Sequence, residues 1–179
     1  MANKLKQIFK KHEAIKWGDF ILSSGKATDL YIDARKVVLC TEGISEIKRL
    51  FWRNVRKNML TFDTIGGMQT GADAIVGSLL ATKNEQLNGF LWRKEVKKHG
   101  TQQEYEGTLK PYSTIFLIDD VATSGRSLLK VAEKIRQLFD GIWIAGAFVI
   151  VDRQEGAEEA LAAHDIPLYS CLTRSQLTQ

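Results

Sequence analysis

The N-terminal part of the chain combines a helical pattern with a polar stretch. Apolar residues in segment 5–15 recur three or four positions apart, which places them on one face and predicts an amphipathic helix. Residues 17–38 contain many small polar side chains. We expect this segment to be a loop that leads into a short strand at Tyr31 and Ile32.

A second amphipathic helix is predicted over residues 41–58. Its apolar positions, from Ile44 to Val55, keep the same helical spacing. Thr41 is the expected N-cap, because its hydroxyl can accept a hydrogen bond from the free N–H groups of the first turn. Glu42 follows in that turn, where a carboxylate interacts favourably with the helix dipole.

From residue 62 onward, strand patterns and helical patterns alternate with short connections. Strands are predicted over 62–66, 90–92, 114–118, 143–151 and 168–172, and helices over 72–81, 127–139 and 155–164. This order predicts an α/β fold with a mostly parallel sheet and helices on both faces. We expect residues 1–179 to form a single domain, in which residues 1–40 make an N-terminal helix and hood segment.

The composition excludes several classes of protein. Of the 179 residues, 44% are hydrophobic and 26% are charged, as in an average globular domain, which excludes a disordered chain and a disulfide scaffold. Cys40 and Cys171 lie far apart, as is typical of free thiols in a reducing compartment. Because no apolar run has membrane-spanning length and the N-terminus lacks a secretory h-region, we expect a cytoplasmic protein without a membrane partner.

The segment TIFLIDDVATSGRSLLKV, residues 114–131, carries the clearest chemistry. An apolar strand brings Asp119 and Asp120 to its carboxyl end, the edge of an open α/β sheet where ligands bind. A turn of small residues and a helix follow, and the free N–H groups of a helix N-terminus favour phosphate. The two carboxylates would then accept hydrogen bonds from the hydroxyls of a ribose phosphate. The plainer alternative is a helix cap beside a solvated acidic pair.

Residues 118–128, IDDVATSGRSL, resemble the 5-phosphoribosyl-1-diphosphate (PRPP) motif of type I phosphoribosyltransferases. Three further segments are similar to the orotate branch of that family: 20–37 to its N-terminal segment, 91–107 to its mobile catalytic loop, and 151–156 to its Asp-Arg turn beside the base. The resemblance implies that PRPP is bound by Arg93, Lys94, Lys97, His99, Asp119, Asp120, Val121, Ala122, Thr123, Ser124, Gly125, Arg126 and Ser127.

The loop 93–107 concentrates positive charge, with five basic residues between positions 93 and 99. A departing pyrophosphate needs such charge, and a polar loop with a glycine can close and exclude water. The expected catalytic residues are Lys97, His99, Asp119 and Asp120. The alternatives for the loop are a solvated basic segment or a nucleic-acid patch, but the order of its residues within this fold favours catalysis over nucleic-acid binding.

Arg153 follows a predicted strand and is therefore expected at the same sheet edge as Asp119. A guanidinium fork can bind the oxygens of orotate in a bidentate way. The alternative is an arginine at a helix N-terminus that pairs with Asp152 or Glu155. The resemblance further implies that orotate is contacted by Thr123, Arg153, Tyr31 and Ile32, although Tyr31 is equally well explained as a core residue.

The segment GGMQTGADA, residues 66–74, joins a predicted strand to a helix. Glycine-rich turns at such places are common, so the pattern alone is weak. The resemblance makes it the loop whose backbone N–H groups hold pyrophosphate. The residues assigned to that loop are Gly67, Met68, Gln69, Thr70 and Gly71.

Several positions depart from the family's pattern. Ser23 and Thr70 stand where some members have lysine, and Asp29 stands where proline is usual. Lys98 replaces a common aspartate, and Arg126 replaces a small residue or threonine in the phosphate turn. Two cationic contacts to phosphate are therefore expected to be missing, whereas two other positions add positive charge.

The resemblance implies an orotate phosphoribosyltransferase, which converts orotate and PRPP to orotidine 5′-monophosphate and pyrophosphate in pyrimidine biosynthesis. It also implies Mg²⁺ held mainly through substrate and water, without direct protein ligands, and a homodimer whose catalytic loop reaches the neighbouring site. Two alternatives remain, a phosphoribosyltransferase for another nucleobase and a non-catalytic PRPP-sensing regulator of the same fold. Lys97 and His99 argue against the regulator, because a sensor needs no leaving-group chemistry.

Overall fold

The structure, a computed structural model, describes residues 3–21, 27–82, 86–95 and 103–178. The helices are α1 (Asn3–Lys11), α2 (Ala34–Val38), α3 (Thr41–Lys57), α4 (Asp73–Leu80), α5 (Arg126–Leu138), α6 (Ala157–Ala162) and α7 (Arg174–Thr178). The strands are β1 (Ile15–Ile21), β2 (Ala27–Ile32), β3 (Thr64–Met68), β4 (Asn88–Trp92), β5 (Tyr105–Gly107), β6 (Thr114–Ala122), β7 (Trp143–Asp152) and β8 (Leu168–Thr173).

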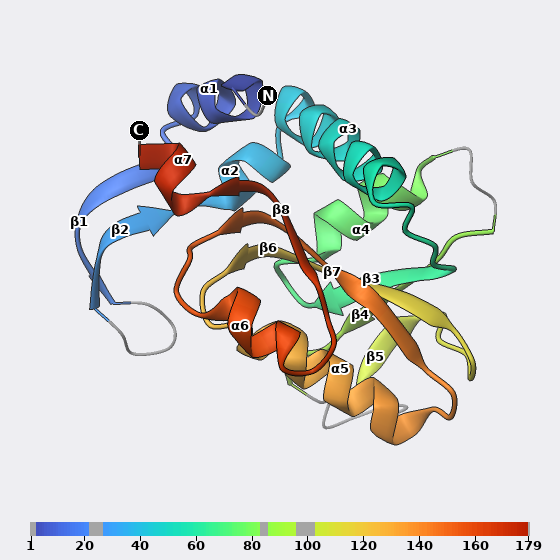
Figure 1. Cartoon of the computed structure of the whole chain (residues 1–179). Coiled ribbons are helices and arrows are strands. Elements are labelled where there is room, and N and C mark those ends of the chain that lie inside the picture. Colours follow the sequence, from blue (N-terminus) through green and yellow to red (C-terminus); the bar gives the residue numbers. More distant parts are fainter. Residues whose placement is uncertain (1–2, 22–26, 83–85, 96–102, 179) are drawn as a thin grey trace.

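A six-stranded sheet with the order β5-β4-β3-β6-β7-β8 forms the centre of the molecule (Figure 1). β5 is antiparallel at one edge, and the other neighbours are parallel. From β3 the chain crosses through α4 to β4, which lies toward one edge of the sheet. From β6 it crosses through α5 to β7, which lies toward the opposite edge. The crossovers therefore diverge between β3 and β6, and such a switch point leaves a crevice at the carboxyl ends of the strands.

Two apolar layers cover the opposite faces of this sheet. Phe116 and Ile118 of β6 belong to the layer that contains α1, α2, α3 and α4, whereas Ile115 and Leu117 belong to the layer of α5 and α6. Successive residues of a strand face opposite sides, so a central strand needs an uninterrupted apolar run. The predicted α/β fold with a mostly parallel sheet and helices on both faces is confirmed.

β1 and β2 form a separate antiparallel hairpin at the side of the molecule toward which the central strands run (Figure 1). The sequence analysis predicted a loop and a short strand here, which is wrong for β1. Most of β1 is exposed, so its residues carry no alternation of apolar and polar positions. Leu30 and Ile32 of β2, in contrast, are buried in the core layer of α1 and α2.

Other boundaries also differ from the prediction. α3 begins after Cys40, which is its N-cap and makes no capping side-chain hydrogen bond, so the assignment of Thr41 as N-cap is wrong. β6 does not end before the acidic pair but continues through Asp119 and Asp120 to Ala122. α2, β5 and α7 were not predicted, because segments of three to five residues are too short to show a period.

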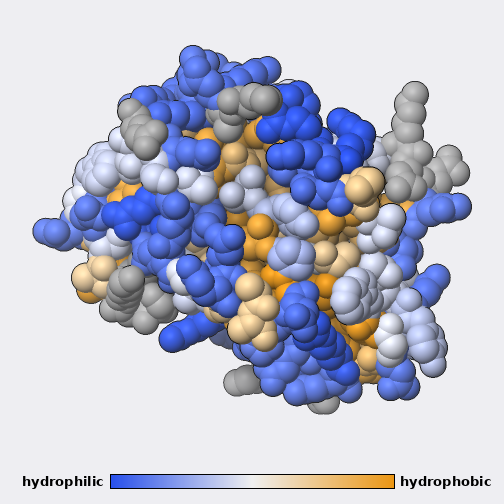
Figure 2. Space-filling view, in the orientation of Figure 1, coloured by the Kyte–Doolittle hydropathy of each residue, from blue (hydrophilic) through white to orange (hydrophobic). Residues whose placement is uncertain are grey.

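The face of the molecule shown in Figure 2 is mainly polar. On the face shown in Figure 2, hydrophilic side chains cover the helices and apolar ones are visible in a band between them. None of the helices in the described ranges combines the length and apolarity required to cross a bilayer.

Candidate active site

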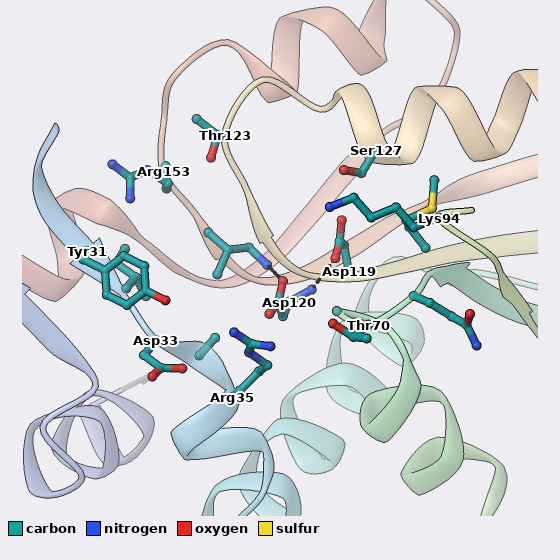
Figure 3. A pocket seen from close by; sticks show the side chains of 16 residues that line it. Tyr31, Asp33, Arg35, Thr70, Lys94, Asp119, Asp120, Thr123, Ser127 and Arg153 are labelled. Carbon is teal, nitrogen blue, oxygen red and sulfur yellow. Dashed lines mark hydrogen bonds between the residues drawn. The ribbon is translucent and has the colours of Figure 1, made fainter. Parts of the chain in front are cut away.

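A cavity of about 420 Å³ lies at the switch point between β3 and β6 (Figure 3). Residues of the hairpin, the loop after β3, the end of β6 and the turn after β7 line it. The residues predicted from sequence that line this cavity are Tyr31, Ile32, Met68, Gln69, Thr70, Gly71, Lys94, Asp119, Asp120, Val121, Thr123, Ser127 and Arg153. The fold thus brings together segments separated by more than a hundred positions.

Asp119 and Asp120 stand at the centre of this cavity. The backbone N–H of Asp120 donates a hydrogen bond to Asp119 Oδ1 at 2.9 Å, and the N–H of Val121 donates to Asp120 Oδ1 at 2.7 Å. Burial, together with the neighbouring charge of Asp120, raises the pKa of Asp119 to about 8. The pair therefore keeps a proton near neutral pH, and a cation or a set of hydroxyl donors would favour its release.

Arg35 is a functional candidate that the sequence analysis missed. It lies in α2, lines the cavity with Asp33 and Ala34, and points toward Asp120 in Figure 3. Burial raises the pKa of Asp120, and the positive charge of Arg35 opposes that rise. The sequence signal that could have identified Arg35 was its place shortly after the predicted short strand at Tyr31 and Ile32.

The phosphate turn lies beside the acidic pair. A second cavity of about 530 Å³ is lined by residues 121–128 together with Lys94, Asp119 and Lys130. Gly125 is the N-cap of α5 with φ 72°, a left-handed conformation that residues with a Cβ rarely adopt. Arg126 is the first residue of α5 and is exposed. The N-terminus of α5 and several cationic side chains therefore border the same second cavity.

The loop after β3 approaches the acidic pair from the other side. Thr70 and Gly71 line the first cavity, whereas Gly67 lies within β3. A Cβ atom at Gly71 would collide with Asp119 Oδ1 and would lie 2.9 Å from Asp120 Oδ1. The loop can come this close to the carboxylates only because it has glycine at this position.

Arg153 is almost completely buried, with 2% of its surface exposed. Its Nε lies 3.0 Å from Glu155 Oε1, its Nη1 donates to the carbonyl of Leu30 at 3.0 Å, and its Nη2 donates to Thr28 Oγ1 at 2.9 Å. The pairing with Glu155 that was considered from the sequence is therefore present. These bonds use three of the five guanidinium N–H groups, and the side chain also lines the cavity.

Comparison with curated proteins identifies the family. The chain is 35% identical over 169 residues to the orotate phosphoribosyltransferase of Pyrococcus furiosus, a match that covers 94% of this chain and 91% of the relative. This chain belongs to the orotate phosphoribosyltransferase family. The Corynebacterium glutamicum orotate phosphoribosyltransferase is 34% identical over 169 residues, with coverage of 93% and 89%. No family-wide sequence profile matches the chain.

Solved structures agree with this assignment. The orotate phosphoribosyltransferase of Aeropyrum pernix has a TM-score of 0.78 and 30% identity, and the match covers 97% of this chain and 95% of that one. The Mycobacterium tuberculosis orotate phosphoribosyltransferase in complex with PRPP has a TM-score of 0.79 at 22% identity, with coverage of 99% of both chains. At that identity the second match supports the type I phosphoribosyltransferase fold alone.

The basic loop of the family is described in part. Lys94 lines both cavities, and its ammonium group points toward the acidic pair in Figure 3. Arg93 instead forms an ion pair with Glu106 across β4 and β5 and lines neither cavity. Lys97, Lys98 and His99 lie outside the described residues, as does Ser23.

Proposed function

We propose that this protein transfers the 5-phosphoribosyl group of PRPP to orotate and releases orotidine 5′-monophosphate and pyrophosphate. The observation that carries the proposal is the convergence of the Asp119–Asp120 pair, the phosphate turn and the loop at 68–71 in one crevice. Membership of the orotate phosphoribosyltransferase family supports it. The pathway would be pyrimidine biosynthesis.

PRPP would bind with its 5′-phosphate at residues 123–127. There the N-terminus of α5 and the hydroxyls of Thr123, Ser124 and Ser127 offer hydrogen-bond donors to a dianion. The ribose hydroxyls would donate to Asp119 and Asp120. When the pair is fully ionised, as a bound cation and these hydroxyl donors would favour, its negative charges would lie beside the sugar and stabilise the positive charge that develops on the ring as the C1–O bond breaks.

The pyrophosphate would leave toward Lys94 and the backbone of residues 67–71. Lys94 is the described cation of the basic loop that lines the cavity, and Lys97 and His99 are the loop residues that the family resemblance adds. Positive charge at this place stabilises the negative charge that grows on the leaving group. Residues 105–107 of the expected loop 93–107 are held in the sheet as β5, so closure of the part of the loop before β5 would exclude water, which would otherwise capture the ribosyl group.

The base would lie between the hairpin and the phosphate turn. Tyr31 and Ile32 line this part of the cavity, and Thr123 and Arg153 face it from the sheet side (Figure 3). Tyr31 is half-buried, and its ring packs at a tilt against that of Phe20 with the ring centroids 5.4 Å apart, so it is a wall of the cavity and not part of the sealed core. The two remaining N–H groups of Arg153 would serve the carboxylate or carbonyl oxygens of orotate.

The residues present fit Mg²⁺ as the cofactor. The carboxylates Asp119 and Asp120 are hard oxygen groups of the kind that can accept hydrogen bonds from the waters of Mg²⁺, and a nearby cation would favour their charged form, which burial disfavours. Mg²⁺ would neutralise the pyrophosphate oxygens. The one cluster of three metal-ligating residues within the described ranges, His12, Cys40 and Glu42, lies outside both cavities. The family resemblance adds that Mg²⁺ would be held mainly through substrate and water.

The assembly would be a cytoplasmic homodimer in which the basic loop of one subunit reaches the site of the other. The family resemblance supports the dimer, and the free thiols of Cys40 and Cys171 suit a reducing compartment. Mixing a Lys97→Ala variant with an Asp120→Asn variant tests the homodimer and the site shared between its subunits. Shared sites predict that subunit exchange restores part of the activity that each variant lacks, whereas activity that stays absent after exchange would contradict the shared site.

The function is tested by mixing the purified protein with orotate, PRPP and Mg²⁺ and following the loss of orotate absorbance. We expect turnover that depends on all three components and is strongly reduced in Asp120→Asn. A panel of other nucleobases with PRPP separates the orotate enzyme from one that uses another base. PRPP binding without transfer to any base would show a sensor and contradict the proposal.

A further inference from the structure

The C-terminal helix α7 is tied to the hairpin by an ion-pair network. Arg174, its first residue, donates from Nη2 to Asp29 Oδ1 at 2.9 Å, and its Nη1 lies 3.5 Å from Glu155 Oε1. The same Glu155 oxygen accepts from Arg153 Nε at 3.0 Å. Arg153 returns to the hairpin through the carbonyl of Leu30. The network therefore forms a ring that begins and ends on β2.

The ring joins three segments that the sequence keeps far apart. Asp29 lies 145 positions from Arg174, and Leu30 lies 123 positions from Arg153. In Figure 1, α7 and the hairpin lie on the same side of the molecule. A second link holds α7 to the turn after β7, because both the N–H and the hydroxyl of Ser175 donate to Gln154 Oε1, at 3.0 and 2.7 Å. Contacts to α7 therefore add to the burial of Leu30 and Ile32 in holding the hairpin in place.

Burial is graded along the ring. Side-chain exposure is 2% for Arg153 and 10% for Glu155, but 32% for Arg174 and 67% for Asp29. Glu155 is shared by two guanidinium groups, so loss of Arg174 would remove one of the cations that hold its carboxylate in place. A shift of that carboxylate would move the buried guanidinium group of Arg153. Because Arg153 is bonded to β2, the shift would also displace Tyr31 and Ile32, which β2 carries.

From these contacts we propose that Arg174 is a positioning residue for the base subsite. With Asp29 it holds β2 against Arg153 and so sets the affinity for the base, while the PRPP subsite at residues 119–127 is built on β6 and α5 and does not depend on it. Asp29 supplies the acidic partner that Arg174 requires. This inference rests on the proposed function for its kinetic part only.

The kinetic test compares Arg174→Ala, Asp29→Ala and the double variant with the unaltered protein. We expect the KM for orotate to rise about threefold to tenfold in each single variant, with the KM for PRPP changed less than about twofold. The double variant should show little further loss, because both changes break the same pair. Arg174→Lys should restore part of the affinity. Arg136→Ala, at an exposed arginine of α5, is the matched control.

A structural measurement tests the effect of Arg174 on the hairpin independently of the reaction. Amide hydrogen exchange of residues 27–32 should be several-fold faster in Arg174→Ala than in the unaltered protein or in Arg136→Ala, with exchange of β6 unchanged. This outcome does not require turnover, so failure of the proposed function would not hide it. Unchanged exchange in the hairpin, or an equal rise in both KM values, would overturn the proposal.

Discussion

Gly71 is packed directly against the carboxylate of Asp119. A Cβ atom at this position would collide with Asp119 Oδ1, and that carboxylate is itself held by the backbone N–H of Asp120. The loop after β3 and the end of β6 therefore form one unit at the switch point of the sheet. A larger side chain at Gly71 would therefore have to displace either the backbone of this loop or the carboxylates of the acidic pair.

Gly71→Ala is expected to damage PRPP binding. The added methyl group would displace a carboxylate that hydrogen-bonds the ribose, and lost hydrogen bonds to a charged group correspond to roughly tenfold to a hundredfold in kcat/KM. Gly77→Ala in α4 is the matched control, because a Cβ there meets nothing within 4 Å. It should keep full turnover and stabilise the helix by about 1 kcal/mol. Equal turnover in the two variants would contradict the packing argument.

Asp120→Asn should lower kcat/KM for PRPP by about tenfold to a thousandfold. The amide keeps the shape of the side chain but removes the negative charge beside the ribose. Steady-state kinetics with PRPP as the varied substrate measure the loss, and circular dichroism verifies the fold. Asp165→Asn, at an exposed turn position, controls for the loss of one acidic charge and should match the unaltered protein.

The buried Asp119 predicts a stability that falls as pH rises. Its pKa is raised to about 8 in the folded protein, against about 3.9 in an unfolded chain. Between these values the folded state binds more protons than the unfolded state, so its stabilising contribution is present at low pH and is lost as pH approaches 8. The slope is at most about 1.4 kcal/mol per pH unit.

Urea unfolding of the ligand-free protein between about pH 5 and pH 8 measures that slope. Asp119→Asn lacks the titrating group and should show a shallower decline over the same range. If the two proteins lose stability in parallel, Asp119 does not hold its proton in the folded state.

Lys94→Gln tests the leaving-group side of the site. The variant keeps much of the side-chain length but removes the positive charge that points toward the acidic pair. If the charge contacts the pyrophosphate as proposed, the KM for PRPP should rise about tenfold and product inhibition by pyrophosphate should weaken. Lys110→Gln, at an exposed position outside both cavities, should leave both quantities unchanged.

The strand that carries the acidic pair and the turn that follows it were predictable from the sequence alone. The apolar run before Asp119, the two adjacent acids and the small-residue turn are contiguous, so these elements follow from residues that lie next to each other, whereas the role of the turn as a phosphate cradle stays a prediction. The long amphipathic helices were predicted for the same reason, since their period is repeated over several turns. The α/β fold follows from the order of these elements.

Tertiary structure alone decided the rest of the site. The exposed hairpin strand β1 has no apolar period that could reveal it. The position of Arg35 near Asp120 depends on how α2 packs against β6. The protonation of Asp119 depends on burial, which no local pattern records. The partners of Arg153 come from positions as distant as Thr28, because a guanidinium group bonds whichever oxygens the folded chain brings near it, whatever their separation in sequence.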